Sequence, residues 1–234
     1  MKAQLAVAGI ILGIAAGIGC KASGSDSPLL LGNFHQLDSS CTPVTSVVAG
    51  AGSLDVSATS VYYVAVDVVS QTSGVVQPGS QPGTKVVSGA PSEIVIDTID
   101  LDYASSDLGA TIAPESYGIH FVISPGSTDN WMGLNLFPGM ANETLASTVV
   151  FGQRASVEVG VRASGQTRAG VAVQSDRAVY PITVYNNGFP GCTYPDLQAT
   201  SGPCGNVGGQ DGTAVGCCPA VDGGTADPNC LTTQ

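Results

Sequence analysis

The feature that most constrains this chain is a two-residue alternation of apolar and polar side chains, which recurs in short runs between residues 54 and 184. In one such run, every second residue from Tyr62 to Val68 is apolar and bulky. Because successive side chains of a strand point to opposite faces of a sheet, this alternation predicts strands with one buried face. Pro-Gly and Ser-Gly pairs, which are turn signals, separate the runs. Similar runs span 54–58, 94–103, 119–123, 157–161, 171–173 and 180–184.

One run changes phase within itself. Its apolar residues alternate as far as Ile96 and resume one residue out of phase at Ile99. A slip of one residue inside an alternating run is typical of a β-bulge, so we expect one at Asp97-Thr98. After residue 28 the chain shows no sustained 3.6-residue period, and we therefore expect essentially no helix there.

Short strands between regular turns predict an all-β fold. We expect one domain over residues 30–187, an antiparallel β-sandwich of Ig-like or jelly-roll-like type with seven or more strands. The alternation then ends, and Gly, Pro, Asp and Cys dominate the tail, residues 188–234. This tail has too little apolar surface to offset the entropy lost when it is ordered. We expect disulfides to hold it as a stapled, loop-rich segment.

Residues 1–19 have the composition of a secretory signal peptide. Lys2 is the only charged residue before an apolar run from Leu5 to Ile18. A membrane-spanning helix needs about 20 apolar residues, and this run is shorter. One positive charge, a short apolar run and small residues at its end are typical of a signal for general export. Residues 20–29 follow, and their Ser, Gly and Pro residues predict a flexible tether.

The sequence Gly17-Ile18-Gly19-Cys20 resembles the lipobox that ends the signal of bacterial lipoproteins. Gly19 fits the small residue before the invariant cysteine, whereas Gly17 stands where Leu is usual. The resemblance implies cleavage before Cys20 and a lipid on its thiol, with palmitate as the expected acyl group. Lys21 in place of Asp implies the outer membrane or cell surface by the simplest sorting rule. The alternative is an ordinary signal cut a few residues later, with Cys20 incidental.

The cysteine count agrees with a lipid on Cys20. The chain has seven cysteines, an odd number for an exported protein, and removing Cys20 leaves six that can form three disulfides. Adjacent cysteines do not pair easily with each other, so we expect Cys217 and Cys218 to have different partners. Cys41 is expected to join the domain entrance to the tail. The six predicted disulfide cysteines are Cys41, Cys192, Cys204, Cys217, Cys218 and Cys230.

A second resemblance covers residues 41–230 and points to a family of bacterial envelope lipoproteins. No activity is attached to that family, so the resemblance implies a location and no reaction. The matching pieces are residues 52–56, 62–66, 165–167, 180–184 and 209–211, the last leading into Cys217-Cys218.

The search for chemical motifs favours a protein that is not an enzyme. A net charge of −11 argues against nucleic-acid binding, since phosphate contacts need a basic face. The nucleophile motif Gly-x-Ser-x-Gly is absent, and two histidines alone cannot form a metal triad. Disulfides are preferred to a zinc site in the tail, which lacks a Cys-x-x-Cys pair. We therefore expect no cofactor.

One acidic concentration, around Asp97, Asp100 and Asp102, supplies candidate calcium ligands, because hard cations take carboxylate oxygens. The alternative is a solvated strand face that discourages pairing with another edge. A calcium site is therefore a weaker interpretation of these residues than a solvated strand face.

The sequence also predicts where four other residues lie in the fold. Trp131 lies beside apolar neighbours and is expected in the core, and Asp211, which precedes a glycine, is expected in a turn. His120 lies within a strand pattern and is expected on a sheet surface. His35, just after the tether, is expected to be exposed to solvent.

We therefore expect a lipid-anchored cell-envelope protein that is a non-enzymatic binding or structural surface module. Its partners would be the membrane, through the lipid, and an unidentified protein or glycan. One alternative is a hydrolase of envelope glycans, using carboxylates such as Asp100 with Asp102, or Glu115 with an unknown partner. Another is a calcium-dependent carbohydrate-binding module.

Overall fold

A computed structural model describes residues 28–70, 93–125, 127, 130–189, 197–199, 202–213 and 217–219. For 197–199 and 217–219 it describes the backbone alone. The predicted signal peptide, Cys20, Cys192 and Cys230 lie outside the described residues. Within the described part of the chain, no helix is both long and apolar enough to cross a membrane.

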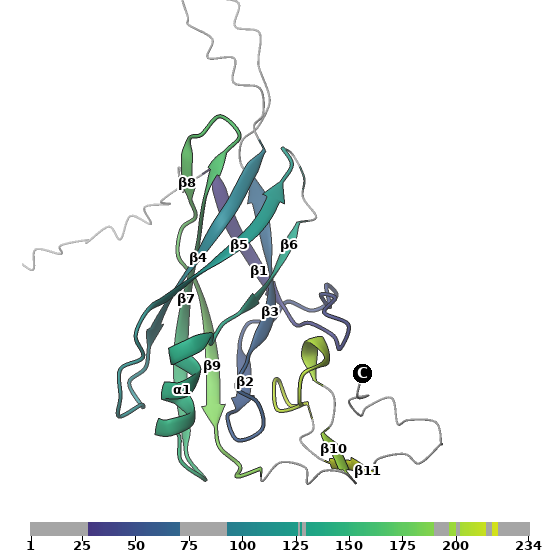
Figure 1. Ribbon diagram of the computed structural model, residues 1–234, viewed down its shortest axis with the longest axis vertical. Coiled ribbons are helices and arrows are strands. Elements are labelled where there is room, and N and C mark those ends of the chain that lie inside the picture. The colour runs from purple at the N-terminus through teal and green to yellow at the C-terminus, as the bar shows by residue number, and fades with distance from the viewer. Residues whose placement is uncertain are drawn as a thin grey trace, which may run out of the picture.

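Strands dominate the described residues (Figure 1). The first nine are β1 Leu29–His35, β2 Gly52–Asp55, β3 Tyr63–Ser70, β4 Ile94–Ala104, β5 Glu115–Ile123, β6 Trp131–Asn135, β7 Arg154–Thr167, β8 Ala172–Gln174 and β9 Ala178–Tyr185. One α-helix, α1 Gly139–Thr148, lies between β6 and β7. The tail contributes β10 Leu197–Ala199, the 3-10 helix η1 Pro203–Gly205 and β11 Cys217–Pro219.

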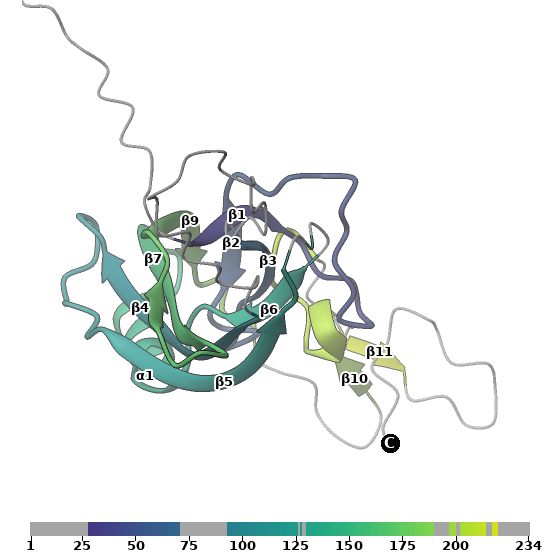
Figure 2. The same cartoon turned by 90° about the horizontal axis from the view of Figure 1, so that it is seen from above.

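Two sheets enclose one apolar core. The larger sheet has the order β2-β9-β7-β4-β5, with β8 paired to β7, and the smaller has the order β1-β3-β6. Seen from above, their strands surround a common interior (Figure 2). In β3 and β7 the buried faces are those that alternation predicts: Val64 and Val66 of β3 belong to the same core cluster as Val157 and Val159 of β7. Two predicted runs depart from the pattern, because Val171 is 61% exposed just before β8 and β2 ends at the buried Asp55. The all-β prediction is confirmed, while the Ig-like or jelly-roll-like type stays a prediction.

The predicted bulge lies where the phase slips. Against both β5 and β7, the register of β4 shifts between Ile96 and Thr98. Gly165 of β7 faces this irregularity, and a Cβ atom there would lie 2.1 Å from the backbone oxygen of Val95. The bulge therefore brings two backbones so close that a residue without a side chain is needed opposite it.

The expectation of essentially no helix after the signal is wrong. Helix α1 is only ten residues long and buries just Ala141 and Leu145, one i,i+4 pair, so its sequence shows no sustained helical period. Its first turn is stabilised from outside, where the Ala141 N–H donates to the Glu115 side chain at 2.7 Å. Tertiary contacts thus stabilise a helix that its own pattern does not predict.

One strand pair departs from the antiparallel expectation. β2 pairs with β9 in parallel, so that Asp55 and Tyr185 are register partners at the ends of their strands. Apolar alternation specifies which face of a strand is buried and carries no information on the direction of its neighbour. In Figure 1 the arrowheads of β2 and β9 consequently lie together at the lower end of the molecule.

Candidate functional site

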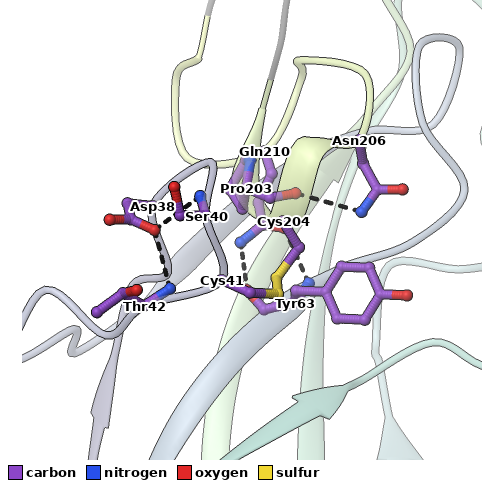
Figure 3. Close-up of a disulfide and its surroundings, with 9 residues drawn as sticks. All are labelled: Asp38, Ser40, Cys41, Thr42, Tyr63, Pro203, Cys204, Asn206 and Gln210. Carbon is purple, nitrogen blue, oxygen red and sulfur yellow. Dashed lines mark hydrogen bonds between the residues drawn. A yellow bond between two sulfur atoms is a disulfide. The ribbon is translucent and has the colours of Figure 1, made fainter. Parts of the chain in front are cut away.

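A disulfide joins the beginning of the domain to the tail, as predicted. Cys41, in the loop after β1, is bonded to Cys204 of η1, 163 residues later (Figure 3). The Cys204 N–H also donates to the backbone oxygen of Asp38 at 2.8 Å. The Asp38 carboxylate in turn accepts the N–H groups of Ser40 and Thr42, both at 2.8 Å. The loop around Cys41 is therefore ordered by its own hydrogen bonds and by the tail.

The partners of the remaining cysteines stay predictions. Cys217 and Cys218 lie in β11, where the backbone alone is described, and Cys192 and Cys230 lie outside the described residues. β11 pairs with β10 in an antiparallel two-stranded sheet.

Residues 202–213, here called the C-terminal segment, run beside β2 and β3. The Asp55 N–H donates to the Gly209 oxygen at 2.8 Å, and the Asp211 N–H donates to the Ser53 oxygen at 2.9 Å. The Gln210 side chain reaches β3, where its Oε1 accepts the Tyr63 N–H at 2.9 Å and its amide nitrogen donates to the Tyr63 oxygen. These contacts attach the segment to β2, an edge strand of the larger sheet, and to the first residue of β3, the middle strand of the smaller sheet.

A buried polar cluster lies beneath this segment. The Tyr62 hydroxyl lies 2.8 and 2.9 Å from the two carboxylate oxygens of Asp211 and 3.1 Å from the Tyr180 hydroxyl. Asp211 also accepts the Ser53 N–H at 2.9 Å. A Cβ atom on Gly52 would lie 1.9 Å from the Tyr62 hydroxyl oxygen, so the ring needs a glycine at this position. The cluster joins Tyr62, the residue just before β3, to β9 and the C-terminal segment.

Burial sets the protonation of this cluster. It raises the pKa of Asp211, against the opposing effect of the Ser53, Tyr62 and Gln210 hydrogen bonds. It also raises the pKa of Tyr180 to about 12 and that of Tyr62 further still. Both phenols therefore stay neutral hydrogen-bond donors, a role that suits anchoring the C-terminal segment.

A cavity of about 420 Å³, here called the end pocket, opens where β2 and β9 both end. Because the pair is parallel, the residues that follow the two strands emerge at the same edge of the sheet. The loop after β9 and the C-terminal segment supply the other walls. The lining residues are Asp55, Tyr185, Asn187, Gly188, Phe189, Gly212 and Thr213.

The carboxylate of Asp55 is the chemical centre of the end pocket. Asp55 as a whole is 1% exposed. Oδ1 accepts the Ser57 N–H at 3.0 Å, the Ser57 hydroxyl at 2.6 Å and the Asn187 N–H at 3.3 Å. The Ser57 oxygen accepts the Phe189 N–H at 2.9 Å. Within the described residues, Oδ2 accepts no hydrogen bond and Asp55 takes part in no ion pair.

The predicted calcium candidates have protein partners. Asp102 accepts the Arg177 Nε–H at 2.9 Å, and this hydrogen bond lowers the pKa of Asp102. Asp100 accepts the Ser116 hydroxyl at 2.6 Å, and Asp97 accepts the Thr98 hydroxyl at 2.8 Å. Across the described part of the chain, no three His, Cys, Asp or Glu side chains are grouped so that they could hold a metal ion.

The carboxylates named for the hydrolase alternative are also engaged elsewhere. Glu115 accepts the Ala141 N–H at the beginning of α1, and Asp100 and Asp102 belong to β4, where Ser116 and Arg177 contact them. The sequence did not single out Asp55 as a site residue. The signal for it was slight: an acidic residue at the end of a short strand run.

Two expectations of position are wrong. His35 is 5% exposed, because β1 already begins at Leu29, and its Nε2 lies 3.0 Å from an Asp67 oxygen. Trp131 is 41% exposed, because the alternation of β6 turns Met132 into the core. His120 is exposed on β5, as predicted.

Asp211 lies in a turn, as predicted, with a backbone φ of 52°. Its buried contacts with Tyr62 were not predicted, because they join positions 149 residues apart.

Comparisons of the chain with protein-family models, with curated proteins and with solved structures found no match.

Proposed function

We propose that this protein is exported, is anchored to the outer membrane or cell surface by a lipid on Cys20, and acts there as a non-enzymatic binding module. The Cys41–Cys204 disulfide carries this proposal. Disulfides of this structural kind persist in oxidising compartments and are rare in the cytosol. A disulfide also accounts for two of the seven cysteines without using Cys20, which the lipobox-like sequence assigns to the anchor.

The end pocket supports binding in preference to hydrolysis. Hydrolysis of a glycosidic bond uses two carboxyl groups on opposite sides of the bond. The lining of the end pocket includes one carboxylate, Asp55, together with polar and aromatic side chains. A single fixed carboxylate beside aromatic rings suits recognition of a ligand.

The anchor is tested by intact-mass measurement of the wild type and of Cys20→Ser, each expressed with its own signal. We expect the wild type to be membrane-bound with a mass that begins at a lipidated Cys20. Cys20→Ser should lose the lipid and leave the membrane fraction. Ser25→Ala, a change of similar size in the tether, should behave as the wild type. A wild-type chain that begins after Ala22 and carries no lipid would overturn the proposal.

The exported location is tested by labelling thiols in unfolded, unreduced protein isolated from the envelope. We expect Cys41 and Cys204 to resist labelling unless a reductant is added. Free thiols at both positions in envelope protein would contradict the oxidising location.

A further inference from the structure

The unusual group in the end pocket is a buried carboxylate that uses only one of its oxygens. Every hydrogen bond that the Asp55 carboxylate accepts from the described residues ends on Oδ1. The donors are two backbone N–H groups and one hydroxyl, all of them neutral. Burial of a carboxylate is unfavourable unless the charge is paired, and this one lacks a cationic partner within the described residues. Oδ2 is thus left for a group from outside.

The charge of the residues that line the end pocket indicates whether the ligand group is a cation or an anion. Among the described residues that line the end pocket, Asp55 is the one charged residue, and the whole chain carries −11. The Arg154 guanidinium lies 5.9 Å from the centre of the Tyr185 ring and does not line the pocket. The surroundings therefore repel an anion and favour a cation.

The aromatic side chains also suit a cation. Phe189 lines the cavity and is partly exposed, whereas the Tyr185 ring, which also lines it, already has the Arg154 guanidinium 5.9 Å from its centre. A cation close to the face of an aromatic ring is attracted by its quadrupole. Asn187 adds a side-chain oxygen that can accept a hydrogen bond from the same group. The Thr213 hydroxyl already accepts the Gly209 N–H and donates to the Gln210 oxygen.

The geometry of Asp55 distinguishes between the two common organic cations. A guanidinium pairs best with both oxygens of a carboxylate, through two parallel N–H bonds. At Asp55 the first oxygen already accepts three hydrogen bonds, so only Oδ2 is available. An ammonium group is a compact charge with three donors and needs a single strong acceptor beside weaker ones.

We propose that the end pocket binds the primary ammonium group of a ligand, with Asp55 Oδ2 as its charged acceptor. The inference rests on the proposed function, because it takes the end pocket as the binding surface of the module. Two sources of this chemistry are amino sugars and alkylamines. Both carry the ammonium group, and only the amino sugars also carry hydroxyl groups that Asn187 would contact.

The test is calorimetric titration of the full mature chain with three probes: glucosamine, butylamine and N-acetylglucosamine. N-acetylglucosamine has the same ring as glucosamine but no positive charge. We expect glucosamine to bind at least tenfold more tightly than N-acetylglucosamine. If butylamine binds as tightly as glucosamine, the site accepts amines in general. If butylamine binds more weakly, the site is specific for amino sugars. Both results support an ammonium site.

Asp55→Asn isolates the charged acceptor. Its amide oxygen can replace Oδ1 towards Ser57 and Asn187, while the amide nitrogen replaces Oδ2 with a donor. We expect at least a tenfold loss of glucosamine affinity. Asp97→Asn removes the same charge from β4, outside the pocket lining, and should leave the affinity unchanged.

Phe189→Leu provides a second variant in case Asp55→Asn does not fold. It keeps an apolar side chain but removes the aromatic face, and should weaken glucosamine binding several-fold while leaving the weaker N-acetylglucosamine binding unchanged. Equal binding of glucosamine and N-acetylglucosamine would overturn the ammonium inference and leave the binding module standing. Amine binding that is unchanged in both variants would also overturn it. Failure of all three probes to bind would overturn the ammonium inference, whereas the anchor is decided separately by the mass of Cys20.

Discussion

The larger sheet and the C-terminal segment are stabilised by different physics. In the sheet, alternate residues such as Val157, Val159 and Ile182 are fully buried against one core. The C-terminal segment buries mainly Gly202, Pro203 and residues 208–210, none of them a large aliphatic side chain. It is held by the disulfide and by hydrogen bonds to β2 and β3. The comparison teaches that apolar burial is distributed over many residues, whereas the attachment of the segment depends on a few contacts.

Backbone strain follows the same division. Among the described residues, the non-glycine residues with positive φ are Cys41, Cys204 and Asp211, at 61°, 56° and 52°. All three lie where the C-terminal segment meets the rest of the molecule. A left-handed conformation of a non-glycine residue costs about 1–3 kcal/mol. The disulfide and the buried contacts of Asp211 offset that cost, so their loss should release the segment.

The largest effect is expected for a truncation in the sheet. Ile99 is fully buried in β4, and Ile99→Ala should lower the free energy of unfolding by about 2–5 kcal/mol. Val122→Ala on β5, where the side chain is 43% exposed, should change it by less than about 0.5 kcal/mol. Urea unfolding monitored by circular dichroism measures both. Equal effects would mean that burial does not dominate the stability of the sheet.

Removal of the disulfide is expected to separate the two regions. The double variant Cys41→Ser, Cys204→Ser should lose about 2–4 kcal/mol of unfolding free energy, because the bond closes a long loop in the unfolded chain. Hydrogen exchange should show early loss of protection in residues 202–213, with the amides of β4 and β7 still protected. Simultaneous loss in both places would show that the segment and the sheet unfold as one unit.

The buried hydroxyl of Tyr62 should have the next largest effect. Tyr62→Phe removes the donor that contacts both Asp211 oxygens, and should cost about 1–3 kcal/mol. Tyr117→Phe is the control in the sheet, because its hydroxyl makes one longer bond of 3.3 Å to the Asn135 oxygen. We expect that control to cost less than about 1 kcal/mol. Chemical unfolding of both variants gives the comparison.

A steric variant reaches the same contact from the opposite side. Gly52→Ala would place a methyl group 1.9 Å from the Tyr62 hydroxyl and should displace it from Asp211, again at a cost of about 1–3 kcal/mol. Gly50→Ala introduces its methyl group where nothing lies within 4 Å and should be neutral. If both substitutions are neutral, the Tyr62–Asp211 contact does not anchor the segment.

The smallest effect is an opposite response of the two regions to acid. Burial raises the pKa of Asp211 above its ordinary value of 3.8, so the folded state binds this proton more tightly than the unfolded chain. Its contribution to stability therefore falls as pH rises from 3.8 through the folded pKa. The Arg177 hydrogen bond lowers the pKa of Asp102, whose contribution is present above 3.8 and is lost as pH falls through the folded pKa.

Unfolding free energies of Asp211→Asn and Asp102→Asn, measured against the wild type over about pH 2–7, test this difference. The unfolding free energy of the wild type should rise relative to that of Asp211→Asn as pH falls towards 3.8. Its excess over the unfolding free energy of Asp102→Asn should shrink below pH 3.8. Parallel pH profiles for the two variants would be inconsistent with the assigned environments.

Much of the sheet was predictable because its signals are local. The alternation around Val157 and Val159 reports burial residue by residue, and the phase slip at Asp97 reports the bulge. For Trp131, two local signals gave opposite predictions. Its apolar neighbours suggested the core, yet the period-two pattern of Met132 and Leu134 places it on the outer face.

The sequence by itself determined the strand faces, the bulge and the need for a cross-link between Cys41 and the tail, since each follows from neighbours in the chain or from composition. Only the tertiary structure decided the parallel pairing of β2 with β9, and with it the end pocket around Asp55. It also decided that Tyr62 meets Asp211, 149 residues later. The physical reason is that alternation encodes which face of a strand is buried. Which distant segment lies beside that strand depends on the packing of the whole core and on the closure of long loops.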